Sequence, residues 1–182
     1  MSVNNRIYVN YDAPEGYSDD IYPIAHFPDK GVVVWPYRRC KIVRRAHEEG
    51  SLYYALNSAF SSILNVYDDA VLQTQAGCSP YRIDIALVDY NSGKNIWIDV
   101  EIDEPYDGVT RKPSHFKGCG DNFRDSYLNH LGWIVVRFSE NQVHYDLNGC
   151  KAFIAKLLKS LDPDLQVSES LLSTVVPAQE QR

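Results

Sequence analysis

Three acidic residues, Asp99, Glu101 and Asp103, alternate with apolar residues in the stretch Asn95–Gly108. An alternation of period two is typical of a β-strand, and it would place the three carboxylates on one face of a sheet. Like charges at that spacing repel one another unless a positive partner compensates them. The stretch therefore predicts either a cation site or a solvated strand face balanced by nearby arginines and lysines.

A second strand, predicted over Tyr81–Tyr90, is joined to the first by the turn sequence NSGK. A hairpin closed by that turn puts Asp84 directly opposite Glu101, and Arg82 opposite Asp103. Directly opposed residues have their Cβ atoms ~5 Å apart, which allows two carboxylates to share one ligand. A slip of one residue in the pairing would carry Asp84 to the other face of the sheet.

Carboxylate oxygens at this separation suit Mg²⁺ or Mn²⁺, which binds one or two carboxylates and keeps several water ligands for a phosphate group. Asp84 and Glu101 are therefore the predicted metal ligands. The competing interpretation is a strand face without a metal, stabilised by Arg82 and by lysines close to it.

The surrounding sequence predicts the elements that position these strands. Apolar residues recur at helical spacing in EEGSLYYALNSAFSSIL, NFRDSYLNHL and NGCKAFIAKLLKSL. Further strand patterns occur in GVVVWPY, DAVLQTQ and GWIVVRFS. From the first helix onward the order is helix, three strands, helix, strand, helix. This order indicates an α/β fold in which helices flank a mixed β-sheet.

The 182 residues, 45% of them hydrophobic, suit a single domain. We divide the chain into an N-terminal extension with a basic segment (1–45), a core (46–161) and a polar, frayed C-terminal tail (162–182). Within the extension, residues 1–30 are expected to be irregular or to form short edge strands. No apolar run approaches the ~18 residues of a membrane span, and the first residues lack the pattern of a secretion signal. Four scattered cysteines without a CxxC pair fit a reducing compartment. We expect a soluble, cytoplasmic protein.

The net charge of −6 is unevenly distributed along the chain. The segment Tyr37–Arg45 holds five basic residues and no acid, whereas the N-terminal region is acidic. Such a stripe can follow the phosphates of a nucleic acid, or it can be a solvated face or a partner for the acidic N-terminal region. The contacts to nucleic acid predicted in this stripe are Arg38, Arg39, Arg44 and Arg45.

Taken together, the motifs resemble the PD-(D/E)XK nuclease superfamily: an aspartate in one strand, a turn and an acidic motif in the antiparallel partner, with a glutamate-bearing helix before them. More narrowly, IDIAL, WIDVEIDEPYDG, SHF and DNFRDSYLNHLGWIVVRFSENQV are similar to the branch that includes the very-short-patch repair endonucleases. The resemblance covers roughly Glu48–Val143. It implies a restriction-endonuclease-like core (αβββαβ) and a metal-dependent nuclease that hydrolyses phosphodiester bonds, with DNA as the favoured substrate and Mg²⁺ or Mn²⁺ as cofactor.

The resemblance also implies roles for single residues. Asp84 matches the metal-binding aspartate, and Glu101 matches the acidic metal ligand, with the Ile102 carbonyl as a further oxygen ligand. Glu49 matches the catalytic glutamate of the first helix, although its neighbour Glu48 is an alternative match. An acid at this position can equally serve to stabilise the N-terminus of the helix.

The chain departs from the superfamily at Asp103, where a lysine usually helps to activate the attacking water. An acid is common at this position in the named branch, where histidines or other bases take part. His115 is therefore the predicted general acid or base, because imidazole transfers protons near neutral pH. A histidine in a loop can also be incidental, and Lys112 or Lys117 can supply the missing positive charge.

Two arginines match positions that recur in the branch. Arg124 is expected either to contact a phosphate or to pair with a carboxylate, and Arg137 is expected to reach the acidic face and form a buried pair. Arg111 and Lys112 extend the predicted phosphate contacts, which would make binding sensitive to salt. The carboxylates available to Arg124 are Glu101, Asp121 and Asp125.

Two other classes of function remain open. The first is a catalytically inactive module that keeps the fold for nucleic-acid binding or protein assembly, which the absent lysine at Asp103 favours. The second is an interaction protein whose acidic strand face docks a basic partner. If the chain is a nuclease, its small size and net negative charge predict a homodimer or a partner protein that supplies specificity.

Overall fold

The computed structural model describes most of the chain, namely residues 6–17, 20–40, 47–72, 80–90, 94–106, 110–115 and 120–182. Its helices are α1 (His47–Phe60), α2 (Asp121–His130), α3 (Glu140–Tyr145), α4 (Leu147–Leu161) and α5 (Glu169–Ser173). Within these ranges, no helix has the length and hydrophobicity needed to cross a lipid bilayer.

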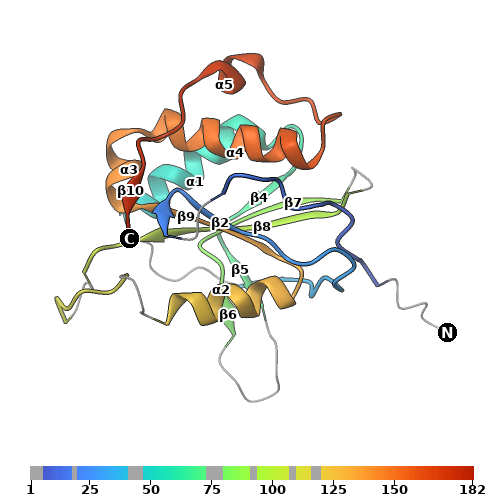
Figure 1. Cartoon of the computed structure of the whole chain (residues 1–182), viewed down its shortest axis with the longest axis horizontal. Helices are drawn as coiled ribbons and strands as arrows, with labels where there is room; N and C mark the ends of the chain where they lie inside the picture. Colours follow the sequence, from blue (N-terminus) through green and yellow to red (C-terminus); the bar gives the residue numbers. More distant parts are fainter. Residues whose placement is uncertain are drawn as a thin grey trace.

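A five-stranded mixed sheet forms the centre of the fold (Figure 1). In spatial order its strands are β2 (Ile24–His26), β9 (Ile134–Ser139), β8 (Ile96–Asp103), β7 (Ile85–Asp89) and β4 (Asn65–Tyr67). Strands β8 and β9 run parallel, and the other neighbouring pairs are antiparallel. Helices α1, α3 and α4 lie on one side of the sheet and α2 lies on the other (Figure 1). The predicted α/β fold with a mixed sheet is confirmed.

The register between β7 and β8 is the one predicted from the turn. Ala86 lies opposite Asp99, and the neighbouring pairs keep the same register, with Ile85 opposite Val100 and Leu87 opposite Ile98. Because β7 begins at Ile85, Asp84 lies one residue beyond the end of this ladder, at the level of Glu101. The register therefore puts the two predicted metal ligands at the same end of the strand pair.

A smaller sheet consists of β3 (Arg38–Arg39), β5 (Ala70–Leu72) and β6 (Tyr81–Arg82). The strand predicted before the NSGK turn is thus divided between two sheets. Arg82 pairs within the smaller sheet, so its predicted position opposite Asp103 is wrong. The chain diverges at Asp84, whose side chain accepts a hydrogen bond from the Ile102 N–H (3.3 Å).

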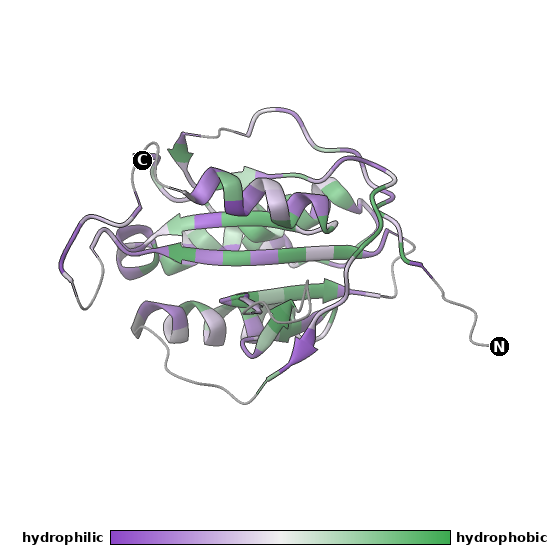
Figure 2. Cartoon of the chain, turned by 90° about the horizontal axis from the view of Figure 1, so that it is seen from below, coloured by the Kyte–Doolittle hydropathy of each residue, from purple (hydrophilic) through white to green (hydrophobic). Residues whose placement is uncertain are grey.

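Every residue of β8 is buried, including its three acids. On one face, β8 packs into the core with α1, whose periodic residues Leu52, Leu56 and Phe60 are fully buried as their spacing predicts. The other face carries the acids, and Figure 2 shows hydrophilic segments between hydrophobic ones along the long central strands. Since helices cover both faces of the sheet, neither face is left to solvent.

Both ends of the described chain take part in the fold. Strand β2 extends the large sheet by pairing with β9, and β1 (Ile21–Tyr22) pairs with β10 (Glu180–Gln181). Short strands in the N-terminal region are therefore confirmed, whereas the frayed C-terminal tail is wrong. The strand predicted over GVVVWPY is also wrong, because Val33 makes only an isolated bridge with Tyr8.

Candidate functional site

The three acids of β8 lie beneath α2, where 0% of Asp99 and 3% each of Glu101 and Asp103 are exposed. A buried carboxylate is stable only when it is paired, hydrogen-bonded or protonated. The interpretations of this row as a solvated face or as a docking surface for a basic partner are therefore wrong. Each acid instead has its own partners.

Glu101 is held by a bidentate ion pair with Arg124 of α2. The two terminal guanidinium nitrogens of Arg124 each lie 2.6 Å from a Glu101 oxygen, and one of them also donates to the Arg82 carbonyl at 2.8 Å. Burial would lower the pKa of Arg124, but the charge of Glu101 raises it above its usual value. Of the carboxylates predicted as possible partners of Arg124, the fold selects Glu101. Arg124 therefore supplies part of the positive charge that a metal ion was expected to supply to this carboxylate.

Asp84 lies near two other carboxylates. Burial, followed by the negative charges of Glu101 and Glu49, raises the pKa of Asp84 well above its ordinary value, although Arg124 and the Ile102 N–H oppose the rise. Glu49 itself is buried and forms an ion pair with Arg82. The fold thus brings the predicted residues Glu49, Asp84 and Glu101 into one region.

Asp99 belongs to the same region, although the sequence did not single it out as a site residue. Among the described residues, no donor reaches either of its carboxylate oxygens. Burial and the charge of Glu101 raise the pKa of Asp99 well above its ordinary value, which favours the neutral form of this acid. The acidic centre is the set Glu49, Asp84, Asp99 and Glu101.

The two glutamates at the start of α1 point to different surroundings. Glu48 pairs with His144 of α3 at 2.9 Å, whereas Glu49 contributes negative charge at Asp84. Of the two possible matches to the helix glutamate, Glu49 is therefore the one that belongs to the acidic centre.

Asp103 is part of a separate buried network. Arg137, with no exposed surface, donates to Asp103 at 2.6 Å and to Asp125 of α2 at 2.6 Å, and the Tyr22 hydroxyl donates to the other Asp103 oxygen at 2.7 Å. Burial lowers the pKa of Arg137, but the hydrogen bond to Asp125 and the charge of Asp103 raise it further than burial lowers it. The expected buried pairing of Arg137 is confirmed, and its partners are Asp103 and Asp125.

His115 lies beside this network. Its Nδ1 is 2.8 Å from Asp121 and 3.4 Å from Asp103, and the three side chains, here called the histidine centre, have ligand atoms within 4.8 Å of one another. Burial lowers the pKa of His115, but the Asp121 hydrogen bond and the Asp103 charge raise it overall. Arg182 also pairs with Asp121 at 2.7 Å. Asp121 was absent from the predicted catalytic set. The sequence feature that could have drawn attention to it is its position as an acid in the first turn of α2.

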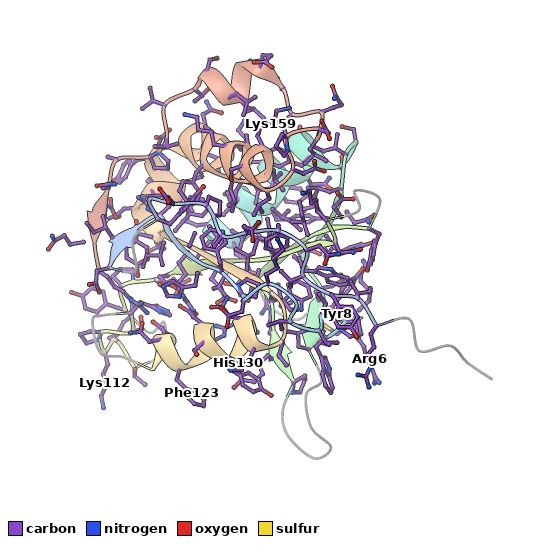
Figure 3. The ribbon with its side chains drawn as sticks, turned by 45° about the vertical axis from the view of Figure 1, so that its right-hand side comes forward. Arg6, Tyr8, Lys112, Phe123, His130 and Lys159 are labelled. Atoms are coloured by element: carbon purple, nitrogen blue, oxygen red, sulfur yellow. The ribbon has the colours of Figure 1, made fainter. Side chains whose placement is uncertain are left out.

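The predicted phosphate contacts are dispersed. Arg38 and Arg39 are exposed on β3, where Arg39 pairs with Asp69 and lies 4.3 Å from the centroid of the Tyr67 ring. Arg111 and Lys112 are exposed in the loop after β8, and Figure 3 shows Lys112 projecting from the edge of the molecule. Three further predicted residues, Arg44, Arg45 and Lys117, lie outside the described residues.

Comparison with protein-family models, with curated proteins and with solved structures gave no match for this chain. The chemistry of the site must therefore be argued from its own geometry.

Proposed function

We propose that this protein is a metal-dependent nuclease that hydrolyses phosphodiester bonds, with DNA as the favoured substrate, at the acidic centre. One observation carries the proposal: Asp84 and Glu101 meet at the same end of the β7–β8 pair, where burial and then negative charge from Glu101 and Glu49 raise the pKa of Asp84. A cation would relieve that repulsion.

The residues of the acidic centre fit a hard divalent cation. All four are carboxylates, the donor type that Mg²⁺ and Mn²⁺ prefer. Two arginines, Arg82 and Arg124, face the four acids, and the Asp99 oxygens have no donor within the described part of the chain. Asp84 and Glu101 would hold the ion, which when bound lowers the pKa of a water ligand and offsets charge on the phosphate.

The protein's own side chains would contribute binding and proton transfer. Arg124, which now pairs with Glu101, has the planar fork of donors that also binds phosphate oxygens, so it can exchange its carboxylate partner for the substrate. The raised pKa of His115 favours the protonated imidazole, which can donate a proton to a leaving oxygen. Exposed Arg111 and Lys112 would contact neighbouring phosphates.

The test is cleavage of plasmid DNA, single-stranded DNA and RNA in Mg²⁺ and in Mn²⁺. We expect Asp84→Asn and Glu49→Gln to lose about 100-fold or more of the activity. Glu48→Gln is the matched control, because it makes the same change one residue away in a side chain that pairs with His144. Equal cleavage by all four proteins would reject the acidic centre as the active site.

An inactive module for nucleic-acid binding or protein assembly is the second candidate. The observation that favours it is the bidentate Glu101–Arg124 pair, which already compensates one predicted metal ligand. Thermal unfolding with and without Mn²⁺ separates the two functions. A rise in melting temperature that disappears in Asp84→Asn supports the nuclease, and no rise in the native protein supports the module.

A further inference from the structure

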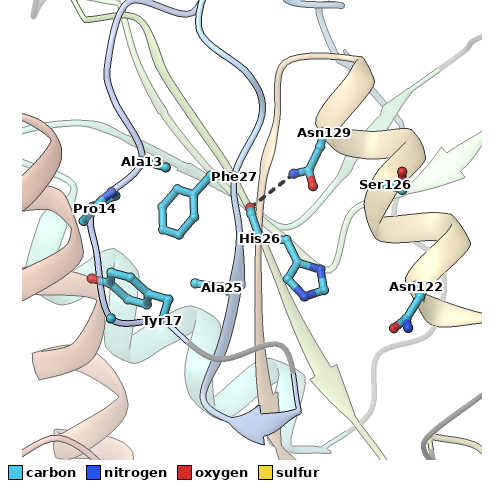
Figure 4. Close-up of a pocket in the computed structure, with 10 residues that line it drawn as sticks. Ala13, Pro14, Tyr17, Ala25, His26, Phe27, Asn122, Ser126 and Asn129 are labelled. Atoms are coloured by element: carbon cyan, nitrogen blue, oxygen red, sulfur yellow. Dashed lines mark hydrogen bonds between the residues drawn. The ribbon is translucent and has the colours of Figure 1, made fainter.

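A cleft lies between α2 and strand β2, and none of its lining residues belongs to the acidic centre. It has a volume of about 530 Å³, within the range of sites that hold small organic ligands. Its floor is β2, one wall is α2, and the opposite wall is the N-terminal segment around Tyr17 together with Phe27 (Figure 4). The two walls differ in chemistry.

The α2 wall presents three polar side chains at helical spacing: Asn122, Ser126 and Asn129. The amide nitrogen of Asn129 donates to the carbonyls of His26 (3.1 Å) and Trp133 (2.8 Å), so its two N–H groups are used and its oxygen remains as an acceptor.

At the other end of this wall, the amide oxygen of Asn122 accepts from Arg182 at 3.0 Å. Its amide nitrogen is thereby oriented as a donor, since a guanidinium offers no acceptor. Asn129 lies seven positions after Asn122 on the helix, which corresponds to ~10 Å along the axis, with the Ser126 hydroxyl between them. The wall therefore offers an acceptor at Asn129, a hydroxyl at Ser126 and a donor at Asn122, spread over about the length of a nucleoside.

The opposite wall is aromatic. Phe27 and Tyr17 pack edge to face with ring centroids 5.2 Å apart, and Tyr17 is supported in turn by Phe153 at 5.6 Å. Between the walls, the His26 ring points toward α2 (Figure 4), and its Nδ1 lies 3.1 Å from Asp125. A supported aromatic surface facing hydrogen-bonding groups suits a flat ring with polar edges, which is the shape of a nucleobase.

We propose that this cleft binds a nucleotide whose base carries an exocyclic amino group. The amino group of adenine, cytosine or guanine would donate to the Asn129 oxygen, the ring would lie against Phe27, and the sugar would reach Ser126 and Asn122. Thymine presents a carbonyl oxygen where cytosine presents its amine, and this oxygen would face the Asn129 acceptor without a proton. The choice of a nucleotide over other flat ligands rests on the proposed nuclease function.

The cleft is also connected to the buried network under α2. Asp125 accepts from His26 at the cleft and from Arg137, which binds Asp103. Burial would raise the pKa of Asp125, but the bonds from His26 and Arg137 hold it below the usual value, so Asp125 is charged and fixes the His26 ring. The orientation of the His26 ring in the floor of the cleft is thus set by Asp125, and none of the residues that line the cleft belongs to the acidic centre.

The test is a titration of the protein with deoxycytidine, deoxyadenosine or thymidine monophosphate. NMR monitors the binding, and no divalent ion is present. We expect the two amino-bearing nucleotides to bind about tenfold more tightly than thymidine monophosphate. Ser126→Trp fills the cleft from an exposed helix position and should weaken their binding about tenfold or more. His130→Trp, on the same helix but outside the cleft, is the control and should bind as the native protein does.

Equal affinity for all three nucleotides would overturn the assigned base class, and unchanged binding by Ser126→Trp would overturn the location. The comparison of nucleotides needs only the native protein, so it decides the proposal even if the tryptophan variant does not fold. Binding without divalent ions is independent of cleavage. Nucleotide binding retained in a protein that cleaves nothing would reject the nuclease alone, and cleavage without nucleotide binding would reject the cleft alone.

Discussion

Asp99 is fully buried beneath α2, and its pKa is raised well above the ordinary aspartate value by burial and by the charge of Glu101. Above pH ~4 the unfolded chain releases this proton, while the folded protein keeps it until the pH reaches the raised pKa. The folded state binds more protons in that window, so the contribution of Asp99 to stability is highest at low pH and falls as the pH rises through it. The residue therefore imposes a cost on the fold at neutral and alkaline pH.

Replacing Asp99 with asparagine should remove that cost. Asn is similar in shape and uncharged at every pH, so we expect Asp99→Asn to raise the free energy of unfolding by about 1–3 kcal/mol near pH 8 and to change it little near pH 4. Urea unfolding across this range measures the effect. Asp12→Asn, at an exposed ion pair with Lys30, is the control and should stay within about 0.5 kcal/mol. A variant that is less stable than the native protein near pH 8 would contradict a protonated Asp99.

At the scale of the elements, Arg137 joins three of them from its position on β9. It binds Asp103 on β8 and Asp125 on α2, and Asp125 also contacts His26 on β2. Removal of the arginine would leave two buried carboxylates without their cation. We expect Arg137→Met to lower the free energy of unfolding by about 3–5 kcal/mol, measured by urea denaturation.

Arg39→Met is the control for that measurement, because Arg39 pairs with Asp69 on the surface and should cost less than about 1 kcal/mol. Losses of equal size in the two variants would mean that the buried network does not anchor α2 and β2 to the sheet.

Elements with a strong local pattern could be predicted from the sequence. Helices α1, α2 and α4 follow from apolar spacing, and the β7–β8 register follows from a short turn. The burial of the acidic row could not be predicted, because it depends on α2 packing across β8 through polar side chains. Helix α3 was missed although Ser139 and Gln142 form a capping box at its start, a local signal that the sequence offered.

Site residues divide in the same way. The shared level of Asp84 and Glu101 follows from the register, whereas the choice between Glu48 and Glu49 depends on His144, which is 96 residues away from Glu48. Glu101 was one of several carboxylates predicted as possible partners of Arg124, and only the three-dimensional packing of α2 selects it. Long-range contacts of this kind leave no spacing pattern in the chain.

At the scale of the whole molecule, strand β1 from the N-terminal region meets the C-terminal strand β10 beside the histidine centre. Strands β1 and β10 pair, Tyr22 of β1 binds Asp103, and Glu180 of β10 binds Ser139. Next to β10, Arg182 has a side chain that is 3% exposed and binds Asp121. Segments at the two ends of the described chain therefore help to set the electrostatics around His115.

Removal of the Arg182 charge should strengthen the hold of Asp121 on the His115 imidazolium. The pKa of His115 is already raised, so its protonated form stabilises the fold below pH ~6.5, and this contribution disappears as the pH rises through the folded-state pKa. In Arg182→Ala we expect that pKa to rise further, and the loss of the buried ion pair to lower the free energy of unfolding by about 1–3 kcal/mol at neutral pH. NMR titration of the His115 ring measures the first effect and urea unfolding the second, with Arg39→Ala as a control that leaves the His115 titration unchanged. If His115 titrates identically in Arg182→Ala and in the native protein, the C-terminal arginine packs on Asp121 without acting on the histidine. The β1–β10 pair would then stabilise the fold without tuning the site.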